Sequence, residues 1–524
     1  MNKILPPAPN TEIPSQFVLD CLDTENEGDG QLFSALLKDK MLYAQSTGLW
    51  YQWSEHSWVE DKTSVVVGLV KYVIERYAEE ILVYEEKIQE SKTKNSEDDH
   101  KMYARAWEAK IFKLQAKIKA IRKPAGRNAC LEFARTNLNN PLTIVGDEFD
   151  QNPWLLGVKN GVVDLRSGEL YPGEPGQMIL KHCSCDYLGI EEDVDISGIE
   201  NFIGQIYNDD TDLIEFVQRL LGYGLTGLST EHVFPFFIGF GRNGKSLLME
   251  SVMRVMGSYA APIPSDLFLH SNAPRNTGQA DAAIMKLEGL RLAVASEVEE
   301  GSRLAGAQIK KLTGGDTIEG RNPYDKRLRE FRPTHLIVVI GNHEPNPPTG
   351  DKAFWDRSYL IRHNIRFVKR KPETANERQA DPDIEDKMKK LDSQMLTWLV
   401  LGCLEWQKRK KLDPPESVLK ATEEYEEDAD FINQFIEACC TLDDKKITTG
   451  STELYLAFSV WYQETLNQNK RFLPSQRTFG LKLKARDQFR PVSINGIKKY
   501  VGIALNPAWT VRMLDIAMGR KDEF

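Results

Sequence analysis

The chain has 524 residues and a mass of 59.7 kDa, enough for roughly three or four domains of about 150 residues each. Hydrophobic residues make up 41% and charged residues 27%, which is typical of a globular protein with a real core. The 67 Lys and Arg against 77 Asp and Glu give a formal net charge of −10, which excludes a uniformly basic DNA-coating protein but allows local basic patches. No run approaches the ~18 apolar residues of a membrane span, and the start has no signal-peptide core. We therefore expect a cytoplasmic protein with no membrane partner.

The first half of the chain divides into two expected units. Residues 1–150 form the first, in which aromatic residues between 31 and 60 favour short strands and 65–123 has helical spacing. Residues 151–225 form the second, an α+β region that begins with a hairpin. Its turn signals are Asn160-Gly and Ser167-Gly, and a helical pattern follows at 198–222.

The second half alternates strands with helices from 233 to about 370, which is typical of a three-layer α/β unit. We expect this core unit to span 226–412, followed by an acidic linker or helix at 413–430. Residues 431–524 form the last expected unit. Within it, 470–500 carries nine Lys and Arg against the single acid Asp487, a reversal of charge that indicates a separate module.

A phosphate-binding loop is the sharpest signal in the chain. Gly239-Phe-Gly-Arg-Asn-Gly244-Lys245-Ser246 matches G-x4-G-K-[ST], after an apolar strand and before a helix that ends at Gly257. Lys245 would reach the β- and γ-phosphates of ATP, and the Ser246 hydroxyl would ligate Mg²⁺. The expected nucleotide-binding residues are Gly239, Gly241, Arg242, Asn243, Gly244, Lys245, Ser246 and Leu247.

Two later strands end in polar residues that suit ATP hydrolysis. A short apolar strand from Leu290 runs into Glu297, the expected magnesium-holding acid, and Glu299 lies two residues on. Either carboxylate could polarise the attacking water; a solvated acidic turn is the alternative for Glu299. The next strand ends at Asn342, whose amide could position that water, although Asn is also a common strand terminator.

These residues resemble the superfamily III helicases, specifically the phage and plasmid primase-helicase type related to the poxvirus replicative enzyme. The resemblance is carried by Ser296-Glu297, the Thr313-Gly-Gly-Asp316 segment, Gly341-Asn342-His-Glu-Pro345 and Trp355-Asp-Arg357. It extends upstream to a helicase-associated N-terminal region and downstream to a winged-helix module at about 431–505. The chain departs from the family in Asp356, where arginine is frequent, and in Arg366, where proline is frequent.

The resemblance implies an AAA+-like ATPase core in a homo-oligomeric ring, commonly hexameric, that translocates on single-stranded DNA and unwinds forked duplex. The nucleotide would lie between subunits, and Arg357 matches the arginine finger that reaches in from the neighbour. A surface salt bridge to Asp351 or Asp356 is the alternative for Arg357, and Arg362 is the next candidate for the finger.

Two basic segments are candidate DNA contacts. Residues 303–332 hold eight Lys and Arg against four acids, with the turn chemistry of a hairpin tip around Tyr324. By resemblance this is the pore hairpin, and its candidate contacts are Arg321, Lys326 and Arg327. In the tail, a helix and a basic turn suit a winged helix on duplex phosphates, with a protein-partner module as the alternative. Its candidate contacts are Lys482, Lys484, Lys498 and Lys499.

A primase would need an additional carboxylate pair on a strand. Asp193-Val-Asp195 and Asp381-Pro-Asp383 are the candidates, and both are typical of solvated turns. We therefore expect an ATP-dependent replicative helicase of a phage, plasmid or integrated element that works with a separate primase or polymerase. The alternatives are a primase-helicase with a divergent catalytic pair and an ATP-regulated origin-binding or loader protein without unwinding activity.

Overall fold

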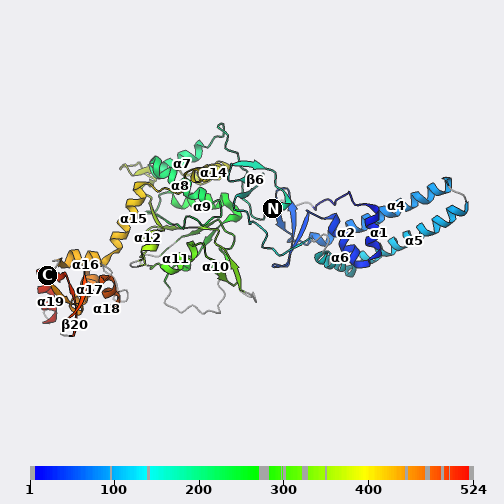
Figure 1. Cartoon of the computed structure of the whole chain (residues 1–524). Helices are drawn as coiled ribbons and strands as arrows, with labels where there is room; N and C mark the ends of the chain where they lie inside the picture. Colours follow the sequence, from blue (N-terminus) through cyan, green and yellow to red (C-terminus); the bar gives the residue numbers. More distant parts are fainter. Residues whose placement is uncertain are drawn as a thin grey trace.

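A computed structural model of the chain shows an elongated molecule in which a helical pair projects from one end and a small module lies at the other (Figure 1). The residues that it describes are 6–94, 97–137, 142–270, 282–296, 298, 302–321, 328–348, 351–442, 447–465, 473–484, 489–494 and 496–518. None of the helices within these ranges is long and apolar enough to cross a membrane.

The N-terminal unit combines helices with a small sheet of strand order β3-β2-β1-β4. Its buried side chains form a cluster of their own that includes Leu32, Phe33, Val73 and Tyr77. The expected short strands and the expected helical region are both present, although residues 31–36 belong to a helix and not to a strand. The elements are α1 (Ser15–Asp23), α2 (Glu25–Leu36), β1 (Met41–Ala44), β2 (Leu49–Ser54), β3 (Ser57–Glu60), α3 (Val65–Leu69), α4 (Lys71–Lys94), α5 (Glu97–Ile121), α6 (Pro124–Thr136) and β4 (Thr143–Ile144).

The region after it begins with a three-stranded antiparallel meander and continues into two helices. Its elements are β5 (Leu155–Val158), β6 (Gly161–Asp164), β7 (Glu169–Tyr171), α7 (Ser197–Tyr207) and α8 (Thr211–Tyr223). The expected hairpin and the expected helix are therefore present. Buried residues of this region, among them Leu156 and Phe216, belong to the same hydrophobic cluster as one face of the central sheet.

The central sheet has five parallel strands in the order β14-β8-β13-β10-β9. In this order β13 lies between β8, the strand that precedes the P-loop in the chain, and β10. All five strands are parallel, and their carboxyl ends therefore meet at one edge. The strands are β8 (Phe234–Ile238), β9 (Ala260–Ile263), β10 (Leu292–Ala295), β13 (Leu336–Gly341) and β14 (Ser358–Arg362).

Helices cover both faces of this sheet, and the side chains of β13 show why. Leu336, Val338 and Ile340 pack into the cluster formed with α7, α8, α9 and α14. Ile337 and Val339 pack into a second cluster on the opposite face. Alternate residues of a strand point to opposite faces, so a strand buried on both sides reads as one continuous apolar run. The three-layer α/β unit expected from the sequence is present.

The remaining elements of the core surround the sheet. They are α9 (Lys245–Met256), α10 (Ala282–Met285), α11 (Gly306–Thr313), β11 (Ile318–Gly320), β12 (Arg329–Phe331), α12 (Lys352–Trp355), β15 (Arg366–Val368), β16 (Glu377–Gln379), α13 (Ile384–Lys390), α14 (Asp392–Arg409) and α15 (Glu416–Ala429). The acidic segment after the core is thus a helix, and it packs along β14, where the Leu360 amide donates to Thr422 Oγ1 at 2.9 Å.

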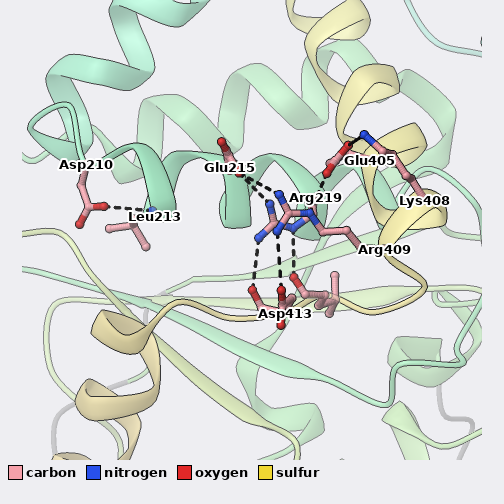
Figure 2. A network of polar contacts seen from close by, with 9 residues as sticks. Asp210, Leu213, Glu215, Arg219, Glu405, Lys408, Arg409 and Asp413 are labelled. Carbon is pink, nitrogen blue, oxygen red and sulfur yellow. Dashed lines mark hydrogen bonds and ion pairs between the residues drawn. The ribbon is translucent and has the colours of Figure 1, made fainter.

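A polar network joins α8 to the end of α14 (Figure 2). The Arg219 guanidinium is 3% exposed and donates to the carbonyl oxygens of Leu412 and Asp413 at 3.1 and 3.2 Å. Glu215 lies 3.4 Å from Arg219 and 3.2 Å from Arg409. Burial lowers the pKa of Arg219, the nearby charge of Arg409 lowers it further, and Glu215 opposes both effects. The network therefore fixes the turn between α14 and α15 against α8.

The C-terminal module has a separate core built from Phe435, Phe458, Trp461, Phe479 and Tyr500, with other apolar residues around them. In its described residues four helices alternate with short strands, and the main sheet has the order β18-β20-β19. The elements are α16 (Phe431–Cys439), β17 (Cys440–Leu442), β18 (Thr448–Gly450), α17 (Ser451–Thr465), α18 (Gln476–Lys484), β19 (Arg490–Ile494), β20 (Ile497–Val501), β21 (Ile503–Leu505) and α19 (Pro507–Ala517).

Arg291 joins the region of β5 to the start of β10. Its side chain is 4% exposed, stacks on Tyr259 at 4.4 Å, and donates to the carbonyl oxygens of Leu225 and Leu155 at 2.5 and 2.8 Å. Buried carbonyl groups that lose their donor retain the full cost of desolvation. Arg291 therefore holds the strand that leads to Glu297 against the preceding region.

We expect Arg291→Ala to lower the free energy of unfolding by about 2–4 kcal/mol, because at least two buried carbonyl groups lose their donor. Urea unfolding followed by circular dichroism measures this change. Lys389→Ala is the control, since Lys389 and its partner Asp386 are both exposed and such pairs contribute about 0–1 kcal/mol. Equal effects of the two substitutions would contradict the role given to Arg291.

Candidate nucleotide-binding site

The P-loop connects the buried strand β8 to α9, as the motif requires. All five residues of β8 are buried, and α9 begins at Lys245. Gly244 has φ +82°, and a Cβ there would lie 2.8 Å from the Ile206 side chain, so only glycine fits without strain. A Cβ on Gly241 would meet nothing within 4 Å, which leaves this part of the loop open to a ligand.

Lys245 is the most constrained charge in the site. Its side chain is 4% exposed, and Nζ donates to the Gly239 carbonyl oxygen and to Asn342 Oδ1, both at 2.8 Å. Burial lowers the pKa of Lys245. No ion pair joins it to a carboxylate in the described ranges. Among the described residues the ammonium therefore has dipoles but no counter-charge around it, and a phosphate would supply that counter-charge.

Strand pairing places Asn342 beside the P-loop. Gly341 pairs with Ile238, and the Gly239 amide donates to the Gly341 carbonyl oxygen at 3.2 Å. Asn342 is the next residue along β13 and therefore lies at the carboxyl edge of the sheet. The structure thus brings together Asn342 and Lys245, which the sequence had placed 97 positions apart.

A cavity of about 580 Å³ opens beside the P-loop. One part of its lining contains the expected residues Gly241, Arg242, Asn243, Gly244, Lys245, Ser246, Leu247 and Asn342. Gly239 belongs to the same loop but is absent from that lining, because it is buried beneath it. Ser246 is exposed at the cavity, so its hydroxyl is available to a ligand.

The sequence did not identify the rest of the cavity lining as part of a nucleotide site. It comes from α7, from α9, from the segment around β15 and β16, and from α13, and it consists of Phe202, Gln205, Glu250, Phe367, Gln379, Ala380, Asp381, Ile384 and Glu385. The Phe367 amide donates to the Arg242 carbonyl oxygen at 2.7 Å, which fixes this wall to the P-loop. A signal was available next to Phe367 in the sequence, where Arg366 was noted only as a departure from the family pattern.

The two candidate acids, Glu297 and Glu299, lie outside the described residues. The strand that leads to them, β10, ends at Ala295 and runs parallel to β13, with Ala295 opposite Val339. The chain after Ala295 therefore leaves the sheet at the edge that carries the P-loop. The expected apolar strand is present, whereas the roles of both carboxylates stay predictions.

His363 lies directly beneath the P-loop and was not singled out from the sequence. It is 3% exposed, its carbonyl oxygen lies 3.5 Å from Asn243 Nδ2, and its ring stacks on Phe237. Nε2 lies 3.4 Å from the Tyr207 hydroxyl, and Nδ1 is buried without a hydrogen-bond partner. Burial, reinforced by the positive charge of Lys245, lowers the pKa of His363 to about 3.

Arg357 lies at the opposite edge of the sheet from the P-loop. Its carbonyl oxygen accepts from the Phe234 amide at 2.7 Å, at the start of β8, whereas Arg362 pairs with Ile238 at the end. Five strand residues, or roughly 16 Å, separate the two ends. Arg357 therefore cannot serve the nucleotide site of its own subunit.

The side chain of Arg357 is not engaged in the salt bridge considered as the alternative. Nη1 donates to the Ala353 carbonyl oxygen at 2.7 Å, and Nε is buried without a hydrogen-bond partner. Asp351 instead pairs with Lys310 at 2.6 Å. Arg362, the second candidate for the finger, forms ion pairs with Glu424 and with Glu344.

The candidate DNA contacts divide into described and undescribed residues. Arg321 follows β11, which pairs with β12 as an antiparallel hairpin, while Lys326 and Arg327 lie outside the described residues. In the C-terminal module Lys484 and Lys498 are exposed and Lys499 is half-buried. The Lys482 ammonium lies 4.3 Å from the centre of the Phe431 ring, so this side chain packs against α16.

Comparisons with known proteins relate the chain distantly to viral putative helicases and primases. Residues 30–219 match the family model described as "D5 N terminal like". The chain is 25% identical over 431 residues to "Putative helicase L207/L206" of Acanthamoeba polyphaga mimivirus, covering 79% of this chain and 43% of that protein. It is 24% identical over 339 residues to "Putative helicase 121R" of Invertebrate iridescent virus 3, covering 60% of this chain and 36% of that protein.

A further relative is named a primase. The chain is 24% identical over 338 residues to "Putative primase C962R" of African swine fever virus (strain Badajoz 1971 Vero-adapted), covering 61% of this chain and 34% of that protein. The solved "A form apo structure of NrS-1 C terminal region-CTR" is 13% identical and covers 58% of this chain and 75% of that one, with a TM-score of 0.37. The chain is thus a distant relative of viral putative helicases and primases, and it spans less than half the length of these curated relatives.

The buried His363 predicts that the protein becomes less stable as the pH is lowered. Its folded pKa of about 3 lies below the ordinary value of 6.5, so below pH 6.5 the unfolded chain binds a proton that the folded chain does not. Stability should therefore be lost progressively from about pH 7 towards pH 3, at a limiting slope of about 1.4 kcal/mol per pH unit for this group.

We expect His363→Gln to flatten that loss in urea unfolding measured from pH 7 to pH 4. His343→Gln is the matched control, because His343 is exposed near the same loop. His335 is buried with a pKa of about 4 and will retain its own share of the slope in both variants. An unchanged slope in His363→Gln would show that His363 is protonated in the folded protein.

Proposed function

We propose that the chain is an ATP-dependent replicative DNA helicase of a phage, plasmid or other mobile element. The observation that carries the proposal is the buried Lys245 ammonium, held between Gly239 and Asn342 at the carboxyl edge of a five-stranded parallel sheet. The strand order, with β13 between the P-loop strand and the acid strand, supports an AAA+-like core. The named relatives support helicase activity in replication.

The residues of the site suit binding and positioning of a nucleoside triphosphate. Lys245 and the backbone amides at the start of α9 would bind phosphate oxygens, since a helix N-terminus favours negative charge. Asn342 would orient a water molecule beside the last phosphate, and Glu297 or Glu299 would accept its proton. Ser246 and Glu297 would hold Mg²⁺, which when bound neutralises charge on the phosphates.

The second part of the cavity suits the base and the sugar of the nucleotide. Phe367 offers an aromatic face next to Gly244, where its ring would lie 3.4 Å from an added Cβ. Gln205, Asp381 and Glu385 line the same cavity and offer amide and carboxylate groups to a base. The volume of about 580 Å³ is within the range of small-molecule sites.

A ring of subunits would complete the site. Arg357 lies at the sheet edge opposite its own P-loop, with a buried Nε that lacks a hydrogen-bond partner. A guanidinium in this position would serve the nucleotide of a neighbouring copy, where its planar donor set can bridge phosphate oxygens. We propose a homo-oligomeric ring, with a hexamer as the expected size.

DNA would contact two basic regions of this ring. The β11–β12 hairpin, with Arg321, Lys326 and Arg327, would follow single-stranded DNA through the centre. The C-terminal module would bind duplex as a winged helix, an interpretation supported by helices α16, α17 and α18 and by the β18-β20-β19 sheet. Lys484, Lys498 and Lys499 are the proposed phosphate contacts, and Lys482 is a weaker one because it packs over Phe431.

A primase-helicase is the second candidate, because one relative is named a putative primase. Incorporation of labelled nucleotides on a single-stranded template would distinguish it. A loader without unwinding activity would hydrolyse ATP and bind duplex without separating strands. Unwinding of forked substrates with single-stranded arms of either polarity, in the presence of ATP and Mg²⁺, therefore tests the proposal directly, and absence of unwinding on both would refute it.

Lys245→Ala should abolish ATP hydrolysis, because it removes the only described cation buried at the phosphate end of the cavity. Release of inorganic phosphate measures the effect, and we expect a loss of at least 100-fold. Lys389→Ala, an exposed lysine outside the cavity, is the control for general damage. Hydrolysis near the wild-type rate in Lys245→Ala would contradict the P-loop assignment.

Arg357→Ala should be inactive alone but should recover activity in a mixture. When Arg357→Ala subunits are mixed with Lys245→Ala subunits, some interfaces pair an intact P-loop with an intact arginine, so hydrolysis should return in part. Phosphate release at several mixing ratios measures this rescue. A group that acts only within its own subunit gives no rescue. Wild-type activity of Arg357→Ala alone would show that another arginine is the finger.

A further inference from the structure

The hairpin of β19 and β20 ends in two exposed isoleucines that the proposed function leaves without a role. Ile494 and Ile497 form the last pair of the ladder, on either side of a turn in which Gly496 has φ +76°. Ile494 is 41% exposed and Ile497 is 58% exposed. Directly opposed residues of an antiparallel pair point to the same face, so the two side chains form one apolar tip.

The opposite face of the hairpin is anchored on α18. Tyr500 is fully buried, and its hydroxyl donates to the Gly480 carbonyl oxygen at 3.0 Å. A Cβ on Gly480 would lie 2.9 Å from that hydroxyl, so glycine permits the contact. By the two-residue alternation of a strand, the isoleucines lie on the face away from Tyr500. The tip is thus held in place by a rigid base and directed away from the module's own core.

The surroundings of the tip favour a nucleic acid over a protein. Lys498 and Lys499 follow Ile497 directly and pair across the ladder with Ser493 and Val492. Lys499 shares the face of the isoleucines, whereas Lys498 lies on the opposite face, with its ammonium 5.7 Å from the centre of the Tyr500 ring. The segment 470–500 carries nine Lys and Arg against one acid, in a chain whose overall net charge is −10. An apolar tip flanked by cations matches a duplex, whose phosphates are anionic and whose base steps are apolar.

We propose that Ile494 and Ile497 form a wedge that inserts between base pairs of double-stranded DNA. Isoleucine is among the side chains that enter partly unstacked base steps from the minor groove and kink the duplex. The lysines would neutralise phosphates on either side of the insertion. This inference rests on the proposed role of the C-terminal module as a duplex-binding unit and adds a function, local unstacking of the duplex.

The test uses the full chain and a duplex that carries 2-aminopurine, a base whose fluorescence rises when it is unstacked. Wild-type protein should raise the fluorescence and bind the duplex. Ile494→Ser with Ile497→Ser should abolish the rise and weaken binding by about 10-fold, while the salt dependence of binding stays unchanged. Lys498→Gln with Lys499→Gln should lower the salt slope by about 1.8 and retain the fluorescence rise at low salt.

Val511→Ser with Leu514→Ser is the matched control. These two residues on α19 are 58% and 52% exposed and belong to the same module, so their substitution removes a similar apolar surface at a different place. The control should behave as wild type. A full fluorescence rise in the isoleucine variant, or an equal loss in the control, would overturn the wedge.

The wedge and the helicase can fail separately. A wild-type chain that unwinds forks but leaves 2-aminopurine stacked would overturn the wedge alone. A chain that unstacks the duplex but neither hydrolyses ATP nor unwinds forks would overturn the proposed helicase and support the wedge. Phosphate release measured in the same samples decides between these outcomes.

Discussion

The buried ammonium of Lys245 is the interaction on which the arrangement of the site depends. It joins the P-loop carbonyl of Gly239 to the amide oxygen of Asn342 and so connects the ends of two neighbouring strands. A buried cation that has only dipoles around it is costly, and it favours any ligand that brings negative charge. The same contact therefore shapes the free site and prepares it for a phosphate.

The parallel sheet imposes the second constraint, since every strand ends at the same edge. The P-loop, Asn342 and the chain after Ala295 leave the sheet there, while Arg357 enters β14 at the other edge. A single subunit thus has the P-loop and Lys245 at one edge and an incompletely satisfied guanidinium at the other. The proposed ring, in which the two edges would meet, is an arrangement that would use both.

The helix α15 connects the carboxyl edge of the sheet to the C-terminal module. On this helix, Thr422 Oγ1 accepts a hydrogen bond from the Leu360 amide, and the Tyr425 hydroxyl donates to the Pro345 carbonyl oxygen. Glu424 forms an ion pair with Arg362. Pro345 and Arg362 follow Asn342 and Ile361 closely in the chain, so a shift at the ends of β13 and β14 has a direct path of contacts into α15. The C-terminal module thus has a core of its own, and the helix that leads to it contacts the ends of β13 and β14.

The sequence alone determined the elements with strong local signals: the glycine loop between strand and helix, the apolar strands of the sheet, the helical stretch after residue 65 and the basic tail. These depend on short-range chemistry, which a linear pattern records. Only the tertiary structure decided three features of the site. These are the lining of the cavity by Phe367 and Gln205, the burial of His363, and the position of Arg357 at the far edge. Strand order and register bring such residues together over 100 or more positions, and local patterns carry no information about which strands become neighbours.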